Sequence, residues 1–487
     1  MNRHLVLGGP GAGKTERLLR VVEEALGRGV RPGRVAFVAF TNTAADEARD
    51  RAARKLGLAP KALPYFRTIH SLCYRALGLR RYNVIDRGDL RGLADQTDER
   101  LTGAIAGDWS GGEVGDRMLG LDHYARAVRQ PLRAAWGEHG GWDWHRQLRF
   151  SEAYGALKRE TGKLDFTDML GRYVAEGAPA LVELAVVDEG QDLTPLQWAV
   201  VERAFAGAQE LWVGGDDDQA IHRWAGADVA RFLALGARAE TEVLPVSHRL
   251  PRAVFDIGER IVGRISRRYA KQRGATGRVG NVAWYRGIGE VNLGPGTWLL
   301  LARTTYQLDA LVQLARWTGV PYMVQGRPAV NRQDIQIIQG YEALRAGRAI
   351  PGGLAELVAS AMLVAAPGVG DSENDREWTA VELGLDCRAI WHDALVGMDL
   401  DDREFYLACR RRGESLTAAP RVRISTVHGA KGRQADHVLL LTDLTPLTHA
   451  GFLKEPDDEH RVFYVGATRA LESLHLVAPQ TAYEYPI

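Results

Sequence analysis

The sequence has few cysteines, no long apolar run and almost no net charge. Its three cysteines are scattered through 487 residues without metal-ligand spacing, which predicts free thiols in a reducing compartment and argues against a structural zinc. No apolar stretch approaches the ~20 residues that cross a bilayer, and no signal segment precedes the first motif, so we expect a cytoplasmic protein without a membrane partner. With 62 basic and 61 acidic residues, any nucleic acid has to bind in a local groove.

Lysine is also scarce, since 8 lysines stand against 54 arginines. This bias is typical of a GC-rich bacterial or phage genome, and Lys14 departs from it. Lys14 lies in GGPGAGKT, residues 8–15, where glycines let backbone N–H groups surround a polyphosphate. A strand-like HLVLGG precedes it and a helical pattern follows, as a phosphate loop requires; the alternative is a glycine turn with an incidental lysine. The predicted phosphate ligands are Gly8, Gly11, Ala12, Gly13 and Lys14, with the Thr15 hydroxyl on Mg²⁺.

Short apolar runs separated by helical patterns define the fold class. RVAFVAF, LAVVDE and ELWVGG have the length of buried strands, which indicates a parallel sheet covered on both faces. A second set, GTWLLLAR, VRIST, HVLLLTD and LHLVAP, predicts a second sheet of the same kind. We therefore expect an α/β protein with two sheets, a mostly helical insertion in the first and a short, less regular insertion in the second.

Two adjacent carboxylates end one of these strands, in VVDEGQD at residues 186–192. A phosphate-loop enzyme places one acid there for Mg²⁺ and another to orient the attacking water. Asp188 and Glu189 are predicted to take these roles, and the alternative is a pair of solvated acids at a strand end.

Seven further stretches, in a fixed order, resemble the UvrD/Rep/PcrA helicases of superfamily 1A. They span most of the chain, and so ordered a set is very unlikely to arise by chance. The stretches are AFTNTAADEAR (39–49), RTIHSLCYRAL (67–77), VVDEGQDLTPLQW (186–198), VGGDDDQAIHRWAGAD (213–228), VSHRL (246–250), ISTVHGAKGRQADHV (424–438) and EHRVFYVGATRA (459–470).

The resemblance implies two RecA-like domains with ATP at their interface and single-stranded DNA across both. It places the domain boundaries as follows: first RecA-like ATP-binding domain, 1–78 and 165–246; helical accessory insertion, 79–164; second RecA-like domain, 247–345 and 419–487; reduced accessory insertion, 346–418.

The resemblance also assigns catalytic roles. Lys14, Thr15, Asp188 and Glu189 keep the roles given above, and Gln219 would sense the γ-phosphate. Arg249 and Arg469 would contact the γ-phosphate, and arginines in such a position accelerate comparable phosphoryl transfers by about 10³–10⁵. The remaining nucleotide contact implied is that of Gln434 on the sugar.

Contacts to the DNA strand are implied by a third set of positions. An aromatic face stacks on any base without reading sequence, which suits a motor. A packed core tryptophan remains an alternative for Trp224, and a buried imidazole remains one for His70 and His428. The implied DNA-contacting residues are Phe40, Asn42, His70, His222, Trp224, His428 and Lys431.

The sequence departs from the family pattern in several places. Only MNRHLVL precedes the phosphate loop, so we expect no adenine-reading glutamine segment and a relaxed base preference. His222 stands where the family has a tyrosine and Ala225 where it has an arginine, which weakens two DNA contacts that Arg223 would have to replace. Gln434 stands in place of a glutamate on the nucleotide sugar, and its amide can hydrogen-bond a hydroxyl without charge assistance. The interval 346–418 is short, and little chain follows Arg469 to build a strand-separating wedge, apart from a reduced pin at Tyr483 or Tyr485 or a disordered tail.

Three functions remain open at this point. The first is an ATP-dependent 3′–5′ DNA helicase that moves along single-stranded DNA and binds ss/ds DNA junctions as a monomer. The second is a single-strand translocase or protein-displacing motor with little autonomous unwinding. The third is a clamp switched by nucleotide without hydrolysis. The sequence leaves open the pathway, whether repair, replication or recombination, the protein partners and whether a bacterium or a phage encodes the chain.

Overall fold

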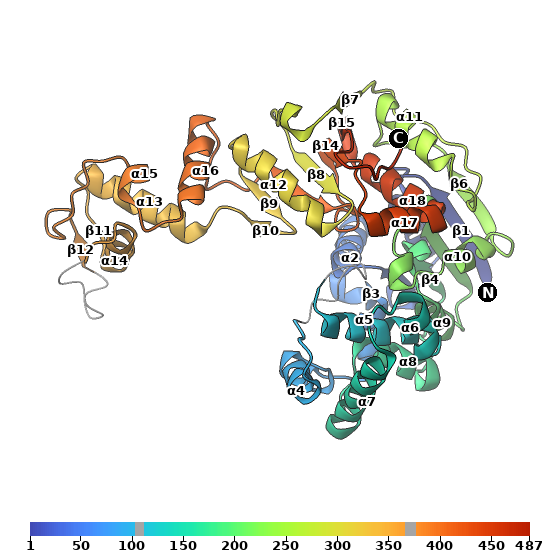
Figure 1. Ribbon diagram of the computed structural model, residues 1–487. Helices are drawn as coiled ribbons and strands as arrows, with labels where there is room; N and C mark the ends of the chain where they lie inside the picture. Colours follow the sequence, from blue (N-terminus) through green and yellow to red (C-terminus); the bar gives the residue numbers. More distant parts are fainter. Residues whose placement is uncertain (103–111, 366–375) are drawn as a thin grey trace. The chain divides into compact units, whose positions relative to one another are not determined.

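The computed structural model describes residues 1–102, 112–365 and 376–487, which form two compact units (Figure 1). Unit 1 contains Met1–Val279 and Ala450–Thr468, and unit 2 contains Gly280–His449 and Arg469–Ile487. Each unit has its own sheet, dominated by parallel pairing and flanked by helices. The expected α/β fold class is confirmed.

The sheet of unit 1 has six strands in the order β3-β2-β4-β5-β1-β6, and all its neighbouring strands are parallel. Parallel strands align their carboxyl ends along one edge, where loops of different chain segments meet. The strands are β1 Asn2–Gly8, β2 Val35–Ala39, β3 Tyr65–Thr68, β4 Leu184–Val187, β5 Glu210–Gly215 and β6 Glu240–Leu244.

Helices cover both faces of this sheet, which explains why its strands are apolar throughout. Val6, Phe37 and Val186 pack on one face, whereas Leu7 and Val38 pack on the other. The first face is covered by α1 Lys14–Gly27 and α2 Asn42–Leu56, and the second by α3 Ile69–Ala76, α8 Phe166–Glu176 and α9 Pro195–Ala204.

A helical insertion lies between α3 and α8. Asp165, the N-cap of α8, ties it to unit 1, because its buried carboxylate accepts hydrogen bonds from Arg126 (2.8 Å), Tyr154 (2.9 Å) and Lys158 (3.0 Å). The helices of the insertion are α4 Arg87–Thr97, α5 Val114–Ala127, α6 Leu132–His139 and α7 Trp144–Thr161.

Unit 1 also includes one segment from late in the chain, Ala450–Thr468. Helix α18 (Pro456–Ala467) packs against α11 (Arg252–Val262), and the Asp457 carboxylate accepts bonds from the backbone N–H and hydroxyl of Ser266, both at 2.9 Å. The short helix α10 spans Val229–Leu235. The domain boundaries inferred from the family resemblance stay a prediction.

The sheet of unit 2 has seven strands in the order β10-β9-β13-β8-β14-β15-β7, with only the β10–β9 pair antiparallel. Its core runs continuously from the sheet into the neighbouring helices. The strands are β7 Asn281–Tyr285, β8 Trp298–Ala302, β9 Tyr322–Val324, β10 Arg327–Pro328, β13 Val422–Thr426, β14 Ala435–Leu441 and β15 Ala470–Val477.

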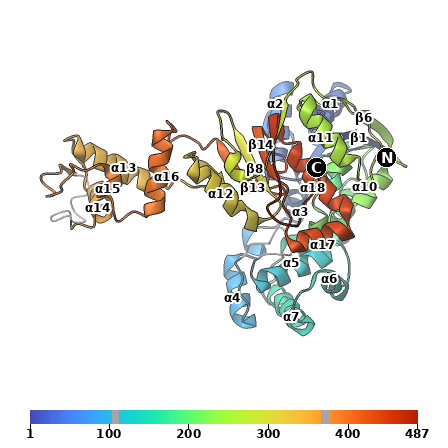
Figure 2. The ribbon, with the colours of Figure 1, turned by 45° about the horizontal axis from the view of Figure 1, so that its top comes forward.

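Short helices make up most of the rest of unit 2 (Figure 2). In the interval 346–418, α14 packs on α13 and α15 packs on α16, beside a two-stranded ribbon of β11 Ile350–Pro351 and β12 Glu377–Trp378. The helices are α12 Leu308–Trp317, α13 Arg332–Arg345, α14 Gly352–Ala361, α15 Trp391–Ala394, α16 Leu400–Arg411 and α17 Pro446–Lys454, the last crossing into unit 1.

The end of the chain is attached to unit 2. The Tyr485 N–H donates to the Thr442 carbonyl (2.9 Å), and the Leu444 N–H donates to the Tyr483 carbonyl (2.8 Å). Tyr485 is buried, so it cannot act as an exposed pin, and the alternative of a disordered tail is also wrong because these bonds order the tail. Tyr483 keeps 38% of its surface exposed.

Cys73, Cys387 and Cys409 are buried free thiols. In the part of the chain that the structure describes, no helix is both long and apolar enough to cross a membrane.

Candidate active site

The phosphate loop joins β1 to α1 in the shape its glycines permit. Gly11 and Gly13 have φ of +73° and +84°, which favour glycine. A Cβ on Gly8 would lie 2.9 Å from the Ala12 Cβ, and a Cβ on Gly11 would lie 2.3 Å from the Arg249 Cβ, whereas one on Gly13 would meet nothing within 4 Å. The loop is therefore packed tightly at Gly8 and Gly11 and open at Gly13, next to the start of α1. An anion can approach the helix N-terminus there.

Lys14 and Thr15 begin α1 and point to different partners. The Lys14 ammonium donates to the carbonyls of Gly8 (2.9 Å) and Gly9 (3.3 Å). The Thr15 hydroxyl donates to the Asp188 carboxylate at 2.7 Å, although the two residues are 173 positions apart in sequence. The loop and the end of β4 thus meet at one edge of the sheet.

Asp188 is a buried carboxylate with an unusual affinity for protons. Burial and the adjacent charge of Glu189 raise the pKa of Asp188 to about 6, even though the Glu189 backbone N–H donates to it at 2.9 Å. A nearby cation would favour its ionised form. The Thr15 hydroxyl and the Asp188 carboxylate are hard oxygen donors, the kind that Mg²⁺ prefers, so the residues present fit that ion.

Glu189 follows in a left-handed backbone conformation, with φ +58°. Such conformations in non-glycine residues are uncommon and cluster at functional sites. The Gln191 amide donates to the Glu189 carboxylate at 2.5 Å and fixes its direction. Glu189 is thereby held next to the Thr15–Asp188 pair.

Gln219 lies in the short helix η5 (Asp217–Gln219) directly after β5. Its amide donates to the Asp216 carboxylate at 2.7 Å, and the Asp216 N–H donates to the Gln191 side-chain oxygen at 3.0 Å. The predicted sensor and the predicted water-orienting acid are therefore linked through two intermediate side chains.

Arg249 lies against the phosphate loop, within unit 1. The Ser247 hydroxyl donates to the Pro10 carbonyl (2.7 Å) and the His248 N–H to the Gly11 carbonyl (2.9 Å). Burial lowers the pKa of Arg249, and the charge of Glu189 opposes that shift. The structure thus brings Arg249 to the same loop as Lys14 and Thr15.

The aromatic residues predicted to contact DNA gather beyond the carboxyl ends of β2 and β5. Phe40, 41% exposed, stacks on His222 with ring centroids 5.6 Å apart, and His222 meets Trp224 edge-on at 6.1 Å. Trp224 is only partly buried, which weakens its interpretation as a core residue. Arg223 pairs with Asp458 at 2.8 Å, a contact that a phosphate would have to replace.

Two more predicted DNA contacts lie on neighbouring elements. Asn42 begins α2 and accepts a hydrogen bond from the Thr68 hydroxyl at 3.3 Å. His70 on α3 meets Phe166 edge-on with ring centroids 5.9 Å apart, and burial lowers the pKa of His70, which favours its neutral form. Both lie at the same sheet edge as Phe40, because β2 and β3 are neighbours.

The remaining predicted residues lie in unit 2. His428, Lys431 and Gln434 occupy the loop between β13 and β14, where Gly432 has φ +81°. Arg469 directly precedes β15, is 2% exposed, and accepts the Ala435 N–H on its carbonyl at 3.2 Å. Gln434 and Arg469 thus lie at one end of the β14–β15 pair.

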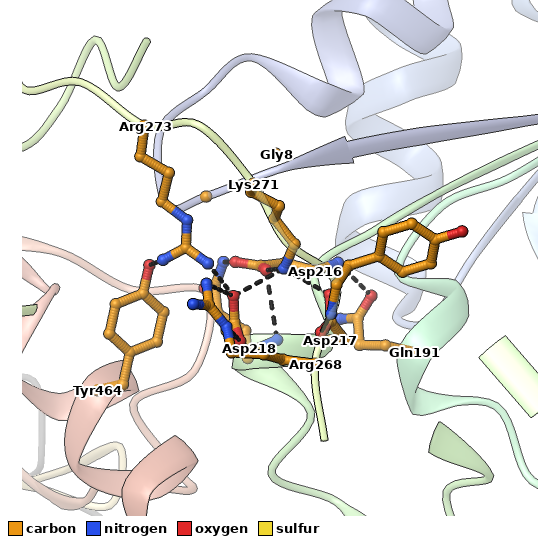
Figure 3. A network of polar contacts seen from close by, with 12 residues as sticks. Gly8, Gln191, Asp216, Asp217, Asp218, Arg268, Lys271, Arg273 and Tyr464 are labelled. Carbon is orange, nitrogen blue, oxygen red and sulfur yellow. Dashed lines mark hydrogen bonds and ion pairs between the residues drawn. The ribbon is translucent and has the colours of Figure 1, made fainter. Parts of the chain in front are cut away.

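The sequence analysis missed a charged cluster around Asp216, Asp217 and Asp218 (Figure 3). Three cations of the segment 266–273 neutralise these buried carboxylates, namely Arg268, Lys271 and Arg273. The available signal was Lys271, which is one of only 8 lysines in the chain.

Two family models match the chain. The UvrD/REP helicase N-terminal domain matches residues 1–240, and the UvrD-like helicase C-terminal domain matches residues 406–481. Together the two ranges cover more than half of the chain, and they contain all the predicted site residues except Arg249.

Two DNA helicases and a subunit of the RecBCD enzyme are among the similar proteins. ATP-dependent DNA helicase UvrD2 of Mycobacterium tuberculosis is 28% identical over 557 aligned residues, which cover 97% of this chain and 76% of the relative. ATP-dependent DNA helicase PcrA of Staphylococcus aureus is 25% identical over 295 residues, 55% of this chain and 39% of the relative. RecBCD enzyme subunit RecB of Mycolicibacterium smegmatis is 38% identical over 110 residues, 20% of this chain and 10% of the relative. The predicted resemblance is confirmed, and the chain belongs to the UvrD-like helicase family.

Proposed function

We propose that the protein is an ATP-dependent 3′–5′ motor on single-stranded DNA that unwinds duplex at ss/ds junctions. The observation that carries this proposal is the 2.7 Å bond between the Thr15 hydroxyl and the Asp188 carboxylate, beside an open phosphate loop and next to Glu189. Family membership supplies the class of reaction, and the polarity follows from the resemblance alone.

In this mechanism ATP binds with its phosphates along residues 8–15. The Lys14 ammonium leaves the Gly8 and Gly9 carbonyls for the outer phosphates, which are stronger acceptors. Thr15 and Asp188 would hold Mg²⁺, which would supply positive charge to the phosphates. Gln219 senses the γ-phosphate, and Gln434 hydrogen-bonds the sugar.

Hydrolysis requires a water molecule in line with the γ-phosphate. Glu189 accepts a hydrogen bond from this water and orients it, while Gln191 keeps the carboxylate in place. Arg249 and Arg469 are assigned the stabilisation of the negative charge that spreads over the γ-phosphate oxygens in the transition state.

The DNA strand is proposed to stack on Phe40, His222 and Trp224. Asn42, His70, His428 and Lys431 supply further contacts to the strand. Trp224 follows Gln219 by five positions, which gives a short path from phosphate state to base movement. Stacking tolerates every base, so the motor would move without sequence preference.

The second candidate is a translocase or protein-displacing motor with little autonomous unwinding. The burial of Tyr485 favours it, because one of the two tail aromatics is thereby removed as a pin. Strand separation on a 3′-tailed duplex, measured beside translocation on single strands, decides between the two. A cytoplasmic monomer stays our expectation for both.

The main test is ATP hydrolysis with and without single-stranded DNA, with GTP measured in parallel. DNA should stimulate the wild-type chain, and Glu189→Gln should lower the stimulated rate about 10²-fold or more. Glu356→Gln, on the exposed face of α14, is the matched control and should leave the rate unchanged. Absence of DNA stimulation in the wild type would overturn the motor and favour a nucleotide-switched clamp.

A further inference from the structure

Three consecutive carboxylates, those of Asp216, Asp217 and Asp218, are completely buried at the end of β5. Unpaired buried charges are costly, so such a group has to be matched by cations. The segment 266–273 supplies them. Figure 3 shows these side chains converging on the triplet from one stretch of loop.

Lys271 is the member of this segment that contacts all three carboxylates. Its ammonium lies 2.6 Å from Asp216 and 2.7 Å from Asp218, and it is also paired with Asp217. Its side chain is 1% exposed. By contrast, Arg268 pairs only with Asp218, at 2.8 Å, and keeps 20% of its side chain exposed.

Asp216 is the carboxylate that connects this cluster to the predicted catalytic groups. One of its oxygens accepts the Lys271 ammonium, and the other accepts the Gln219 amide at 2.7 Å. Its backbone N–H donates to Gln191, whose amide holds Glu189. The Asp216 carboxylate therefore positions the γ-phosphate sensor, and the Asp216 backbone N–H reaches the acid that orients water through Gln191.

The choice of lysine at this position has a physical reason. Burial opposes ionisation of Asp216, but the charges of Lys271 and Arg273 overcome it and hold the pKa of Asp216 below its ordinary value. A compact ammonium reaches the three carboxylates from one point with three rotatable donors, whereas a guanidinium spreads its donors over a rigid plane. In a chain with 54 arginines and 8 lysines, this position nevertheless has lysine.

We infer that Lys271 is a positioning residue for ATP hydrolysis, which fixes the Asp216 carboxylate so that Gln219 keeps its orientation. The inference rests on the proposed function, because it concerns the rate of the same reaction. Lys271 does not hold the phosphates, so it acts on the hydrolytic step and leaves ATP affinity nearly unchanged.

The test uses charge-balanced variants of the full chain. Lys271→Met with Asp217→Asn removes one positive and one negative charge and leaves Asp216 in place. Lys163→Met with Asp89→Asn is the matched control, since it removes a lysine–aspartate ion pair of 2.7 Å that lies in the helical insertion, outside the cluster. Asp216→Asn is measured in parallel, because Lys271 is inferred to act through Asp216.

The readouts are kcat and KM for ATP with saturating single-stranded DNA, and the melting temperature by circular dichroism. We expect the Lys271→Met/Asp217→Asn variant to lose about tenfold or more in kcat, with KM within about threefold, as for a misplaced catalytic group. Asp216→Asn should give a similar loss, and the control should stay within about threefold of wild-type kcat.

Wild-type kcat in the Lys271 variant, or an equal loss in the control, would overturn the inference. So would failure of the Lys271 variant to fold while the control folds, because Lys271 would then serve the fold alone. The wild-type chain separates the two claims. Its failure to hydrolyse ATP with DNA removes the proposed function, whereas normal wild-type turnover with a normal Lys271 variant removes only this inference.

Discussion

The two units contain different kinds of polar cluster. In unit 1 the cluster at the end of β5 consists of three buried carboxylates matched by Arg268, Lys271 and Arg273. In unit 2 a partly buried chain of hydrogen bonds links imidazole, hydroxyl and phenol groups, from His437 through Ser473 (2.7 Å) to His475 (2.8 Å) and Tyr285 (2.9 Å).

This difference separates polar groups that serve chemistry from polar groups that serve packing. Charged groups in a low dielectric have strong fields and fixed directions, which a phosphoryl transfer site needs. The hydrogen-bonded side chains of His437, Ser473 and His475 join neighbouring strands β14 and β15. Both imidazoles contact the Trp298 ring on the same sheet. We therefore expect substitutions at the catalytic site and charged cluster of unit 1 to change the rate of ATP hydrolysis. Substitutions in the hydrogen-bonded side chains of unit 2 should change the free energy of unfolding.

The largest expected effect belongs to Arg249. Arg249→Ala removes a cation from beside the phosphate loop and should lower DNA-stimulated ATP turnover by about 10³-fold. The melting temperature should change little, because burial already disfavours the charged form of this side chain. Turnover and thermal unfolding are measured on the same preparation.

Arg260→Ala is the control for Arg249, since it removes an exposed arginine from the adjacent helix α11. A loss of stability without a loss of turnover in Arg249→Ala would break the comparison between the units.

A smaller effect is expected for DNA binding. Trp224→Ala should weaken binding of a fluorescent single strand by about 1–3 kcal/mol, the value of one stacked base. Trp317→Ala removes a tryptophan of unit 2 that is 81% exposed and should leave the affinity unchanged. Fluorescence anisotropy at fixed salt gives both affinities. Equal losses of affinity in the two variants would show that Trp224 does not stack on the DNA strand.

The smallest effect concerns acid stability. Burial, and then the neighbouring His437, lower the pKa of His475 to about 4. The stabilisation that neutral His475 gives the folded protein is therefore fully present above about pH 6.5, the pKa of histidine in the unfolded chain. It is lost as the pH falls towards 4. Since His475 is partly solvated, we expect about 1–2 kcal/mol of unfolding free energy to be lost over this range.

Urea unfolding at pH 7 and pH 5 tests this expectation. His475→Gln should lose less stability between the two pH values than the wild type, because the titrating group is gone. His145→Gln, at an exposed position of α7, should keep the wild-type difference. A wild-type difference in His475→Gln would assign the acid sensitivity to other groups.

The shape of the phosphate loop could be expected from the sequence, whereas the charged cluster behind it could not. The glycines, Lys14 and Thr15 form a loop whose shape is set by neighbouring residues, so their pattern was sufficient. The contact between Thr15 and Asp188 also followed, since β1 and β4 are parallel strands of one sheet and end at the same edge.

The partners of Asp216 depend on tertiary structure that no local pattern encodes. The segment 266–273 has no helix or strand, and its path beside β5 depends on contacts such as the Asp457 bonds to Ser266. The same reason applies to the burial of Tyr485. Its backbone pairs with Thr442, which is distant in sequence, and no periodic pattern of apolar residues predicts this contact.

Gly11 has a consequence at the level of the gene. Glycine is the only residue without a Cβ, so every missense change of this codon introduces an atom 2.3 Å from the Arg249 Cβ, at a backbone φ of +73°. Gly13 meets no neighbour, and asparagine tolerates its left-handed backbone better than most residues do. In a saturation mutagenesis library, codon 11 should lose all its missense variants under selection for activity, whereas codon 13 should retain asparagine but not aspartate, whose charge would face the phosphates.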